Sequence, residues 1–115
     1  MELTNPYKVP ASEIKSRRLN VQQALRQNDI DGLFIVQRVD LFYFSGTAQN
    51  GYMYIPVQGQ PILFIKQYFP RAAKESSVAD IVKIESMKEI PQLIVDRYGR
   101  LPQVLGFELD VRNLN

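Results

Sequence analysis

Apolar residues recur along this chain at two different spacings, and the change from one to the other predicts its elements. Between residues 13 and 28, three apolar side chains share one helical stripe: Ile14, Val21 and Leu25. Ser12 stands just before this stripe and is predicted to cap the helix. The unbroken apolar run 33–36 follows a turn-rich segment and is typical of a strand that is covered on both faces.

The middle of the chain predicts a helical turn, a loop and a hairpin. Asp40 is placed to cap a single turn over residues 41–44, and the small polar residues Ser45–Gly51 indicate a loop. Two β-rich runs, 52–57 and 61–65, then flank a turn that contains glycine. That spacing is typical of an antiparallel hairpin.

The last third of the chain alternates helix and strand. A short helix is predicted over 70–75 and a strand over 81–84. Ser86 begins a capping-box sequence ahead of a helix over 90–98, and a final strand follows over 104–107. The order of elements therefore predicts an α/β domain, with a mixed β-sheet that contains a hairpin and helices packed on its faces.

Composition indicates one domain and removes most catalytic chemistry. The 115 residues, 45% of them apolar, are enough to close a single core. We expect residues 1–12 to form an extended N-terminal arm and residues 13–115 to form the domain. The chain contains no histidine and no cysteine, which excludes histidine-dependent triads, thiolate nucleophiles, disulfides and zinc held by His or Cys.

Charge and the N-terminus point to the cytoplasm. A formal net charge of +2 is too small to indicate a nucleic-acid partner. The first residues have no basic segment followed by an apolar stretch, so they do not form a signal peptide. The apolar runs are far shorter than the roughly 20 residues that span a bilayer. We therefore expect a cytoplasmic protein with no membrane partner.

The charged residues offer no convincing site of their own. Asp29 and Asp31 are typical of a solvated turn. Glu108 and Asp110 would share a face at the end of the last strand, but a hard cation usually gathers more oxygen ligands than two carboxylates supply. The densest basic cluster indicates a solvated helix face rather than a phosphate site: Lys15, Arg17 and Arg18.

Several segments nevertheless follow one another in a recognisable order. They are 18–36 with Ile30-Asp31-Gly32-Leu33-Phe34-Ile35-Val36 at its end, Asp40-Leu41-Phe42-Tyr43-Phe44-Ser45-Gly46, the hairpin segment 59–64, residues 68–75, and Val104-Leu105-Gly106-Phe107-Glu108. In order and spacing this succession resembles the N-terminal domain of the creatinase/prolidase family over about residues 13–110.

The resemblance implies a longer, two-domain parent enzyme, an Xaa-Pro dipeptidase or aminopeptidase P. In that family a C-terminal domain carries the chemistry, with Asp, His and Glu ligands that hold two divalent metal ions such as Mn, Co or Zn. We therefore expect no catalytic residue and no metal ligand in this chain. The family also implies that the N-terminal domain builds a homodimer interface and lends loops to the rim of the neighbouring subunit's active site.

The loops that match are Ser45–Gly51, after the short helical turn, and Lys66–Arg71, after the hairpin. They supply six candidate contacts to the peptide substrate or to the partner subunit: Ser45, Asn50, Lys66, Tyr68, Phe69 and Arg71. Tyr68 and Phe69 can form an aromatic wall, and Asn50, Lys66 or Arg71 can supply a polar contact to a peptide terminus. In the alternative interpretation, Phe69 belongs to the core and Arg71 to a solvated helix.

Two other functions remain open at this point. The parent can be a creatinase-like enzyme that acts on small amidino compounds. The domain can instead be a non-enzymatic peptide-binding or interaction module. In each case its first expected partner is its own C-terminal domain.

Overall fold

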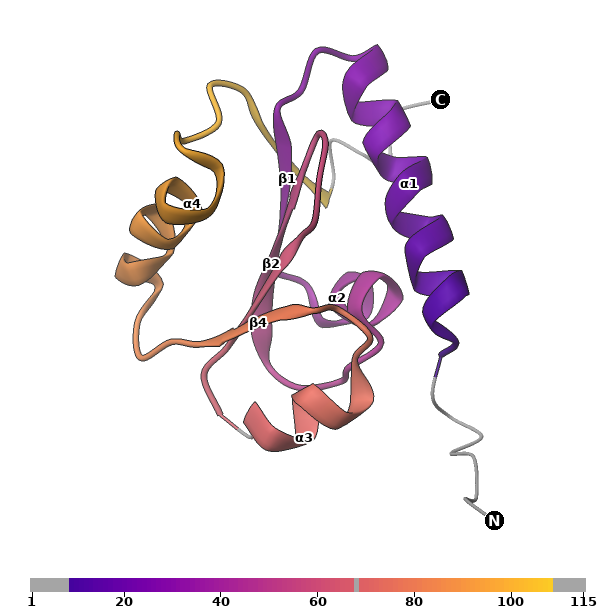
Figure 1. Ribbon diagram of the computed structural model, residues 1–115, viewed down its shortest axis with the longest axis vertical. Coiled ribbons are helices and arrows are strands. Elements are labelled where there is room, and N and C mark those ends of the chain that lie inside the picture. The colour runs from indigo at the N-terminus through magenta and orange to yellow at the C-terminus, as the bar shows by residue number, and fades with distance from the viewer. Residues whose placement is uncertain (1–8, 68, 109–115) are drawn as a thin grey trace.

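The computed structural model describes residues 9–67 and 69–108, which form a mixed sheet with helices on both faces (Figure 1). The predicted α/β architecture is confirmed. In chain order the elements are α1 (Ala11–Gln27), β1 (Gly32–Ile35), α2 (Arg38–Ser45), β2 (Gly51–Pro56), β3 (Ile62–Ile65), α3 (Phe69–Glu75), β4 (Asp80–Lys83), the 3-10 helix η1 (Met87–Glu89), α4 (Ile90–Tyr98) and β5 (Leu105–Phe107).

The sheet has the strand order β4-β3-β2-β1-β5. The predicted hairpin is β2 paired antiparallel with β3, and β2 also runs antiparallel to β1. The two outer pairs, β3 with β4 and β1 with β5, are parallel. Pro56 ends β2, where its missing N–H costs the ladder little.

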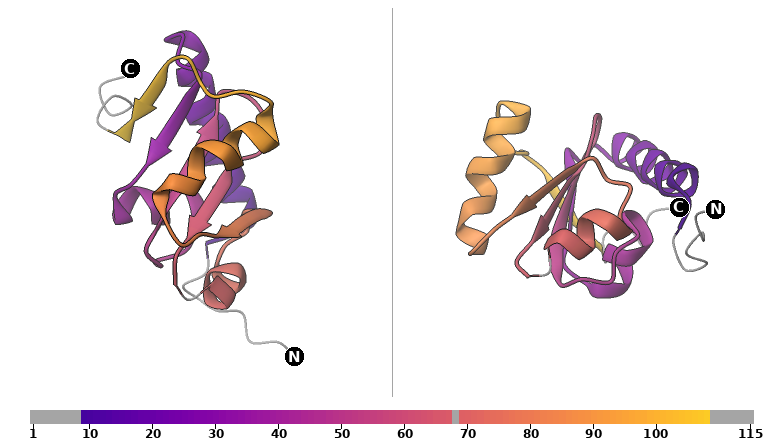
Figure 2. Two further views of the ribbon diagram at one scale, coloured as in Figure 1. Left: turned by 90° about the vertical axis from the view of Figure 1, so that its left-hand side faces the viewer. Right: turned by 60° about the horizontal axis from the view of Figure 1, so that its bottom comes forward.

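One face of the sheet, called here the first face, lies under α1, α2 and α3 (Figures 1 and 2). Alternate strand residues point to this face because side chains along a strand alternate. The buried cluster on this face includes Leu25 from α1, Leu41 from α2 and Ala72 from α3, packed against strand residues such as Ile35 and Leu63. Three helices therefore seal the first face.

The opposite face, the second face, carries η1 and α4 (Figure 2, right view). Ile90 and Ile94 of α4 pack on a second cluster that includes Phe34, Tyr54 and Phe64. All four residues of β1 are buried. The predicted covered run 33–36 is thus confirmed for Leu33, Phe34 and Ile35, whereas Val36 lies beyond the strand and is 43% exposed.

Polar contacts tie the first-face elements together. Arg17 of α1 donates to the Tyr43 carbonyl at 2.9 Å, and its guanidinium carbon lies 4.3 Å from the centre of the Tyr43 ring. The buried Gln22 donates to the carbonyls of Pro56 and Gly59, both at 2.9 Å, which fixes α1 to the hairpin. Arg18 donates to the Gln60 side chain at 3.0 Å. Two members of the basic cluster thus make contacts within the domain.

The predicted turn before β1 also holds β5 in place. Asp29 has a φ of 57°, a left-handed conformation that suits a turn. The Asp31 carboxylate accepts hydrogen bonds from the backbone N–H groups of Gln103 and Val104, each at 2.9 Å. This contact positions the parallel strand β5 beside β1.

Two of the three predicted helix caps were wrong. Ser12 is the second residue of α1, because the Pro10 carbonyl already accepts from Glu13 and Ile14 and the helix begins at Ala11. Asp40 lies inside the first turn of α2, whose capping position is Gln37, so this helix has two turns rather than one. Ser86 is confirmed, since it forms a full capping box with Glu89.

The N-terminal boundary shifts accordingly. Of the predicted arm 1–12, residues 1–8 lie outside the described residues, while Ala11 and Ser12 belong to α1. Within residues 9–67 and 69–108, no helix is both long and apolar enough to cross a membrane.

Candidate functional site

The two loops predicted to contact substrate lie at one end of the sheet. The loop after α2 leads into β2, and the loop after β3 leads into α3. The register pairs Gly51, the first residue of β2, with Ile65, the last residue of β3. Loops that are separate in the sequence therefore meet at the end where β1 and β3 finish.

Glycine is required where these loops meet. A Cβ atom on Gly51 would lie 2.2 Å from the Phe64 carbonyl oxygen and 2.9 Å from the Ile65 Cδ1 atom. The first of these contacts is with backbone, which cannot move aside as a flexible side chain can. The close approach fixes the start of β2 against β3.

The first loop is locked by hydroxyl groups. The Ser45 Oγ donates to the Leu41 carbonyl at 2.5 Å and accepts from the Thr47 backbone N–H at 3.2 Å. The Thr47 Oγ1 accepts from the Gln49 N–H at 3.3 Å. Ser45 and Thr47 are both fully buried, so this loop has a defined shape.

Glu75 of α3 connects this loop to the second one. Its carboxylate accepts from the Thr47 hydroxyl at 2.8 Å and from Arg71 Nε at 2.8 Å. Burial alone would raise the pKa of Glu75, but hydrogen bonds from Thr47, Arg71 and the Ala48 backbone outweigh burial and leave this pKa below its usual value. The carboxylate therefore stays ionised as a structural acceptor.

A pocket of about 200 Å³, with both polar and apolar lining residues, opens beside these loops. Its walls carry the cationic side chains of Arg38 and Lys66, together with the amides of Gln49 and Asn50. The Arg38 guanidinium donates to the Asn50 side-chain oxygen. Two positive charges beside amide groups suit a carboxylate or a peptide carbonyl as ligand.

Glu108 fixes the segment that leads to Arg38. Its side chain is buried and accepts from the backbone N–H groups of Val36 and of Gln37, the latter at 2.8 Å. These groups lie at the N-terminal end of α2, where a negative charge is favourable. Glu108, considered above with Asp110 as a weak metal candidate, thus has a structural role, and Asp110 lies outside the described residues.

The structure describes five of the six predicted contact residues, and these fall into three groups. Asn50 and Lys66 are exposed and line the same pocket. Ser45 is buried inside its loop, and Phe69 is half-buried against the first-face cluster. Arg71 is exposed but paired with Glu75, and Tyr68 lies outside the described residues. The pocket therefore gathers two of the six, and the role of each in substrate contact remains a prediction.

Sequence reasoning missed Arg38, the second cation of the pocket. The available signal was a basic residue three positions after a buried strand, at the strand's carboxyl end. Ligand sites often lie at that end in α/β sheets.

The carboxylates near the two loops already have partners within the domain. Within the part of the chain that the structure describes, no group of three or more Asp, Glu, His or Cys side chains could hold a metal ion. The acidic side chains closest to the loops, Glu75 and Glu108, are engaged with backbone or side-chain donors. The pocket beside them carries the cationic side chains of Arg38 and Lys66.

Comparison with protein families places this arrangement among known domains. Residues 17–114 match the model of the Creatinase/Prolidase N-terminal domain. An Xaa-Pro dipeptidase of Pyrococcus furiosus is 33% identical over 82 residues, which cover 70% of this chain and 24% of that enzyme. The chain thus spans about a quarter of the curated relative that it matches.

Solved structures show the same fold. An Xaa-Pro dipeptidase from Bacillus anthracis superposes with a TM-score of 0.70 at 22% identity, covering 89% of this chain and 28% of the other. The N-terminal domain of the cytoplasmic peptidase PepQ from Mycobacterium tuberculosis H37Rv also gives 0.70, at 19% identity, covering 84% of this chain and 75% of the other. The family match over residues 17–114 shows that the chain belongs to the Creatinase/Prolidase N-terminal domain family.

Proposed function

We propose that this chain is the non-catalytic N-terminal domain of a metal-dependent Xaa-Pro peptidase that works as a homodimer. In this proposal the domain contributes to the dimer interface and to the rim of the partner subunit's active site. The observation that carries the proposal is the family match over residues 17–114. The dipeptidase relative from Pyrococcus furiosus favours a peptidase over a creatinase-like parent.

The side chains of this domain indicate why the chemistry is assigned to the other domain. With no histidine and no cysteine, the chain has no imidazole base and no thiolate nucleophile. Hydrolysis is therefore assigned to the C-terminal domain, where two divalent metal ions would supply the activated water. The compartment we propose is the cytoplasm, which agrees with the description of the Mycobacterium tuberculosis relative as a cytoplasmic peptidase.

The cationic pocket is the part of the rim that we assign to substrate recognition. An Xaa-Pro dipeptide ends in a carboxylate, and a guanidinium group can hold a carboxylate through two parallel hydrogen bonds. Asn50 orients Arg38, while Gly51 and Glu108 fix the segments on either side. Lys66 adds a second positive charge on the same wall.

Steady-state kinetics of the full-length parent enzyme test this role. Replacing Arg38 with Ala should raise KM for an Xaa-Pro dipeptide about tenfold and leave kcat nearly unchanged, because the lost contact is made equally in ground and transition states. Lys66→Ala should act in the same direction with a smaller effect. Arg26→Ala is the matched control, since Arg26 contacts the Val57 carbonyl at the opposite end of the sheet.

Three results would contradict the proposal. An unchanged KM in both pocket variants would show that the pocket does not contact the substrate. A parent enzyme that hydrolyses no Xaa-Pro peptide would contradict the proposed activity. A strictly monomeric parent in light scattering would contradict the proposed dimer interface.

A further inference from the structure

A second polar pocket, of about 240 Å³, lies on the first face of the sheet, beside α1. Four segments form its walls: the first half of α1, the end of α2, residues 60–61 at the hairpin, and the loop 77–79 that leads into β4. Within the described part of the chain, it shares no lining residue with the pocket of Arg38 and Lys66. The two pockets are therefore separate sites.

One hydrogen-bond donor at this pocket has no acceptor. Arg18 Nη1 donates to the Gln60 side-chain oxygen at 3.0 Å, but the buried Nε–H of the same guanidinium group finds no acceptor within residues 9–67 and 69–108. Such unpaired groups are rare in folded proteins, because burying a polar group without a hydrogen bond costs free energy. The unpaired Nε–H therefore indicates that this pocket receives an acceptor from a ligand.

The charges around the pocket are positive. Lys15 lies one turn before Arg18 and lines the same pocket, and it has no ion-pair partner among the residues that the structure describes. The carboxylates that flank the lining segments, Glu13, Glu75 and Asp80, are each paired with an arginine. The first turn of α1, at the positive end of the helix dipole, forms part of the wall. These charges favour an anion.

The other walls are largely apolar and narrow the class of anion. Ile14, Phe44 and Val78 line the pocket and belong to the buried core. Inorganic phosphate would lose its hydration against such walls and gain few donors in exchange. An organic carboxylate fits both parts of the pocket. Its charged end suits a guanidinium edge, which can hold a carboxylate through two parallel hydrogen bonds, and its hydrocarbon part suits the apolar walls.

We propose that this pocket binds a small organic carboxylate with an apolar tail. Arg18 is the anchor, through the edge of its guanidinium group that carries the Nε–H, and Lys15 supplies the second positive charge. Two members of the basic cluster on α1 thus have a role other than the solvated face that the sequence predicted. The inference goes beyond the proposed function, because this pocket is separate from the rim and does not depend on what the parent hydrolyses.

A nuclear magnetic resonance titration of the isotope-labelled 115-residue chain with hexanoate, at constant ionic strength, tests the proposal. Hexanamide has a similar hydrocarbon chain without the charge, and inorganic phosphate has charge without the chain. Arg18→Gln removes the anchor and Lys15→Gln the second charge. Arg17→Gln is the matched control, since Arg17 belongs to the same basic cluster but contacts Tyr43 and Glu13 outside the pocket. Circular dichroism confirms that each variant folds.

Hexanoate should shift the Arg18 Nε–H signal and the amide signals of residues 77–79 until they saturate. The dissociation constant should rise at least about tenfold in Arg18→Gln, because a charged hydrogen-bonding group is lost. It should rise by a smaller factor in Lys15→Gln, whose exposed side chain makes this variant informative even if Arg18→Gln does not fold. In Arg17→Gln it should change by less than about twofold, because salt screens charges outside the pocket.

Four results would overturn the proposal. The first is the absence of a saturable shift with hexanoate. The second is equally tight binding of hexanamide, which would show that the pocket does not recognise charge. The third is tighter binding of phosphate than of hexanoate, which would show that the apolar walls contribute nothing. The fourth is an equal loss of affinity in Arg17→Gln and Arg18→Gln, which would indicate only a general attraction of anions to α1.

Discussion

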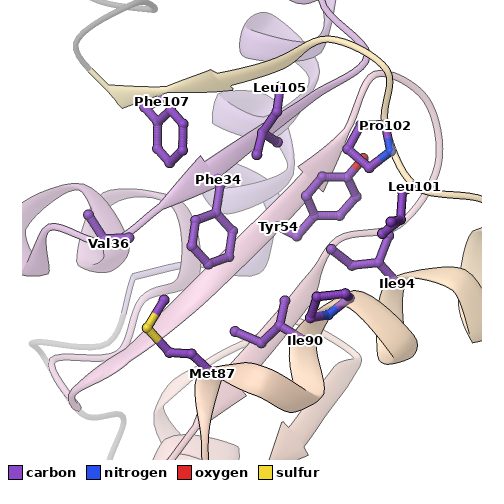
Figure 3. A pocket seen from close by; sticks show the side chains of 11 residues that line it. Phe34, Val36, Tyr54, Met87, Ile90, Ile94, Leu101, Pro102, Leu105 and Phe107 are labelled. Carbon is purple, nitrogen blue, oxygen red and sulfur yellow. The ribbon is translucent and has the colours of Figure 1, made fainter.

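The two faces of the sheet are built from the same strands but closed in different ways. The first face carries three helices, and its strand side chains are buried. The second face carries η1 and α4, and an apolar groove lies between α4 and the strands β1 and β5 (Figure 3). The two faces of β1 are therefore covered to different extents. Phe34 belongs to the buried second-face cluster but also lines the open groove.

The second face is also stabilised by a small set of contacts around α4. The rings of Tyr54 and Tyr98 meet with centres 5.5 Å apart, and the Tyr98 hydroxyl donates to the Gln60 carbonyl at 2.5 Å. Arg97 pairs with Asp80 of the edge strand β4 at 2.7 Å. A single substitution here should therefore weaken the packing of α4 alone. On the first face, the packing is distributed over three helices.

The largest expected effect is a difference in stability between two variants, each with one leucine truncated on one face of the sheet. Leu41→Ala leaves a cavity in the sealed first face and should lower the free energy of unfolding by about 3 kcal/mol. Leu105→Ala removes a side chain that is 39% exposed in the groove and should cost less than about 1 kcal/mol. Urea denaturation of both variants measures the difference, and equal losses would show that the faces are closed to the same degree.

The second-largest expected effect is a loss of stability of the second face at alkaline pH. Burial, with the nearby negative charge of Asp31, raises the pKa of Tyr54 to about 12. Burial also raises the pKa of Tyr98. Because the unfolded tyrosine loses its proton near pH 10 while the folded one keeps it, this stabilisation is complete below pH 10 and lost as the pH rises toward 12.

Urea titrations at pH 8.5 and pH 11 measure this loss, which for Tyr54 amounts to at most about 2 kcal/mol. Tyr54→Phe removes the ionisable group and should make the fall with pH shallower than in the unaltered chain. An identical fall in both proteins would show that other groups cause it.

The smallest effect concerns the helix caps. Ser86→Ala breaks the capping box that begins η1 and α4 and should cost about 1 kcal/mol. Ser12→Ala is the matched control on the first face, where the hydroxyl makes no capping bond, and should change stability by less than about 0.5 kcal/mol. Thermal denaturation compares the two, and a larger loss for Ser12→Ala would reverse the assignment of the caps.

These caps show which parts of the fold local sequence can predict. Ser86 and Glu89 are three residues apart, so both halves of their motif are visible in the sequence. The start of α2 was mispredicted because the segment just before it is held by Glu108, about seventy residues away, which accepts from the N–H groups of Val36 and Gln37. Hydrophobic periodicity depends only on residues that are close in the sequence. It therefore predicted the helices and strands well, but it could not predict a contact between residues that are far apart in the sequence.

The same limit applies to the candidate sites. Loop position was enough to bring Asn50 and Lys66 to one pocket, but Arg38 joins them only through the pairing of β1 with β2. Ser45 was chosen for its hydroxyl, which the folded loop uses internally. The groove needs the strand order itself, because Phe34 and Phe107 are distant in sequence and adjacent only after β5 joins β1.

The most direct test of the central claim is hydrolysis of an Xaa-Pro dipeptide by the purified 115-residue chain and by its full-length parent, both with added Mn²⁺. The claim that this domain assists catalysis without performing it predicts turnover by the parent and none by the 115-residue chain. Turnover by the 115 residues alone, or a parent that cleaves only amidino compounds, would contradict it.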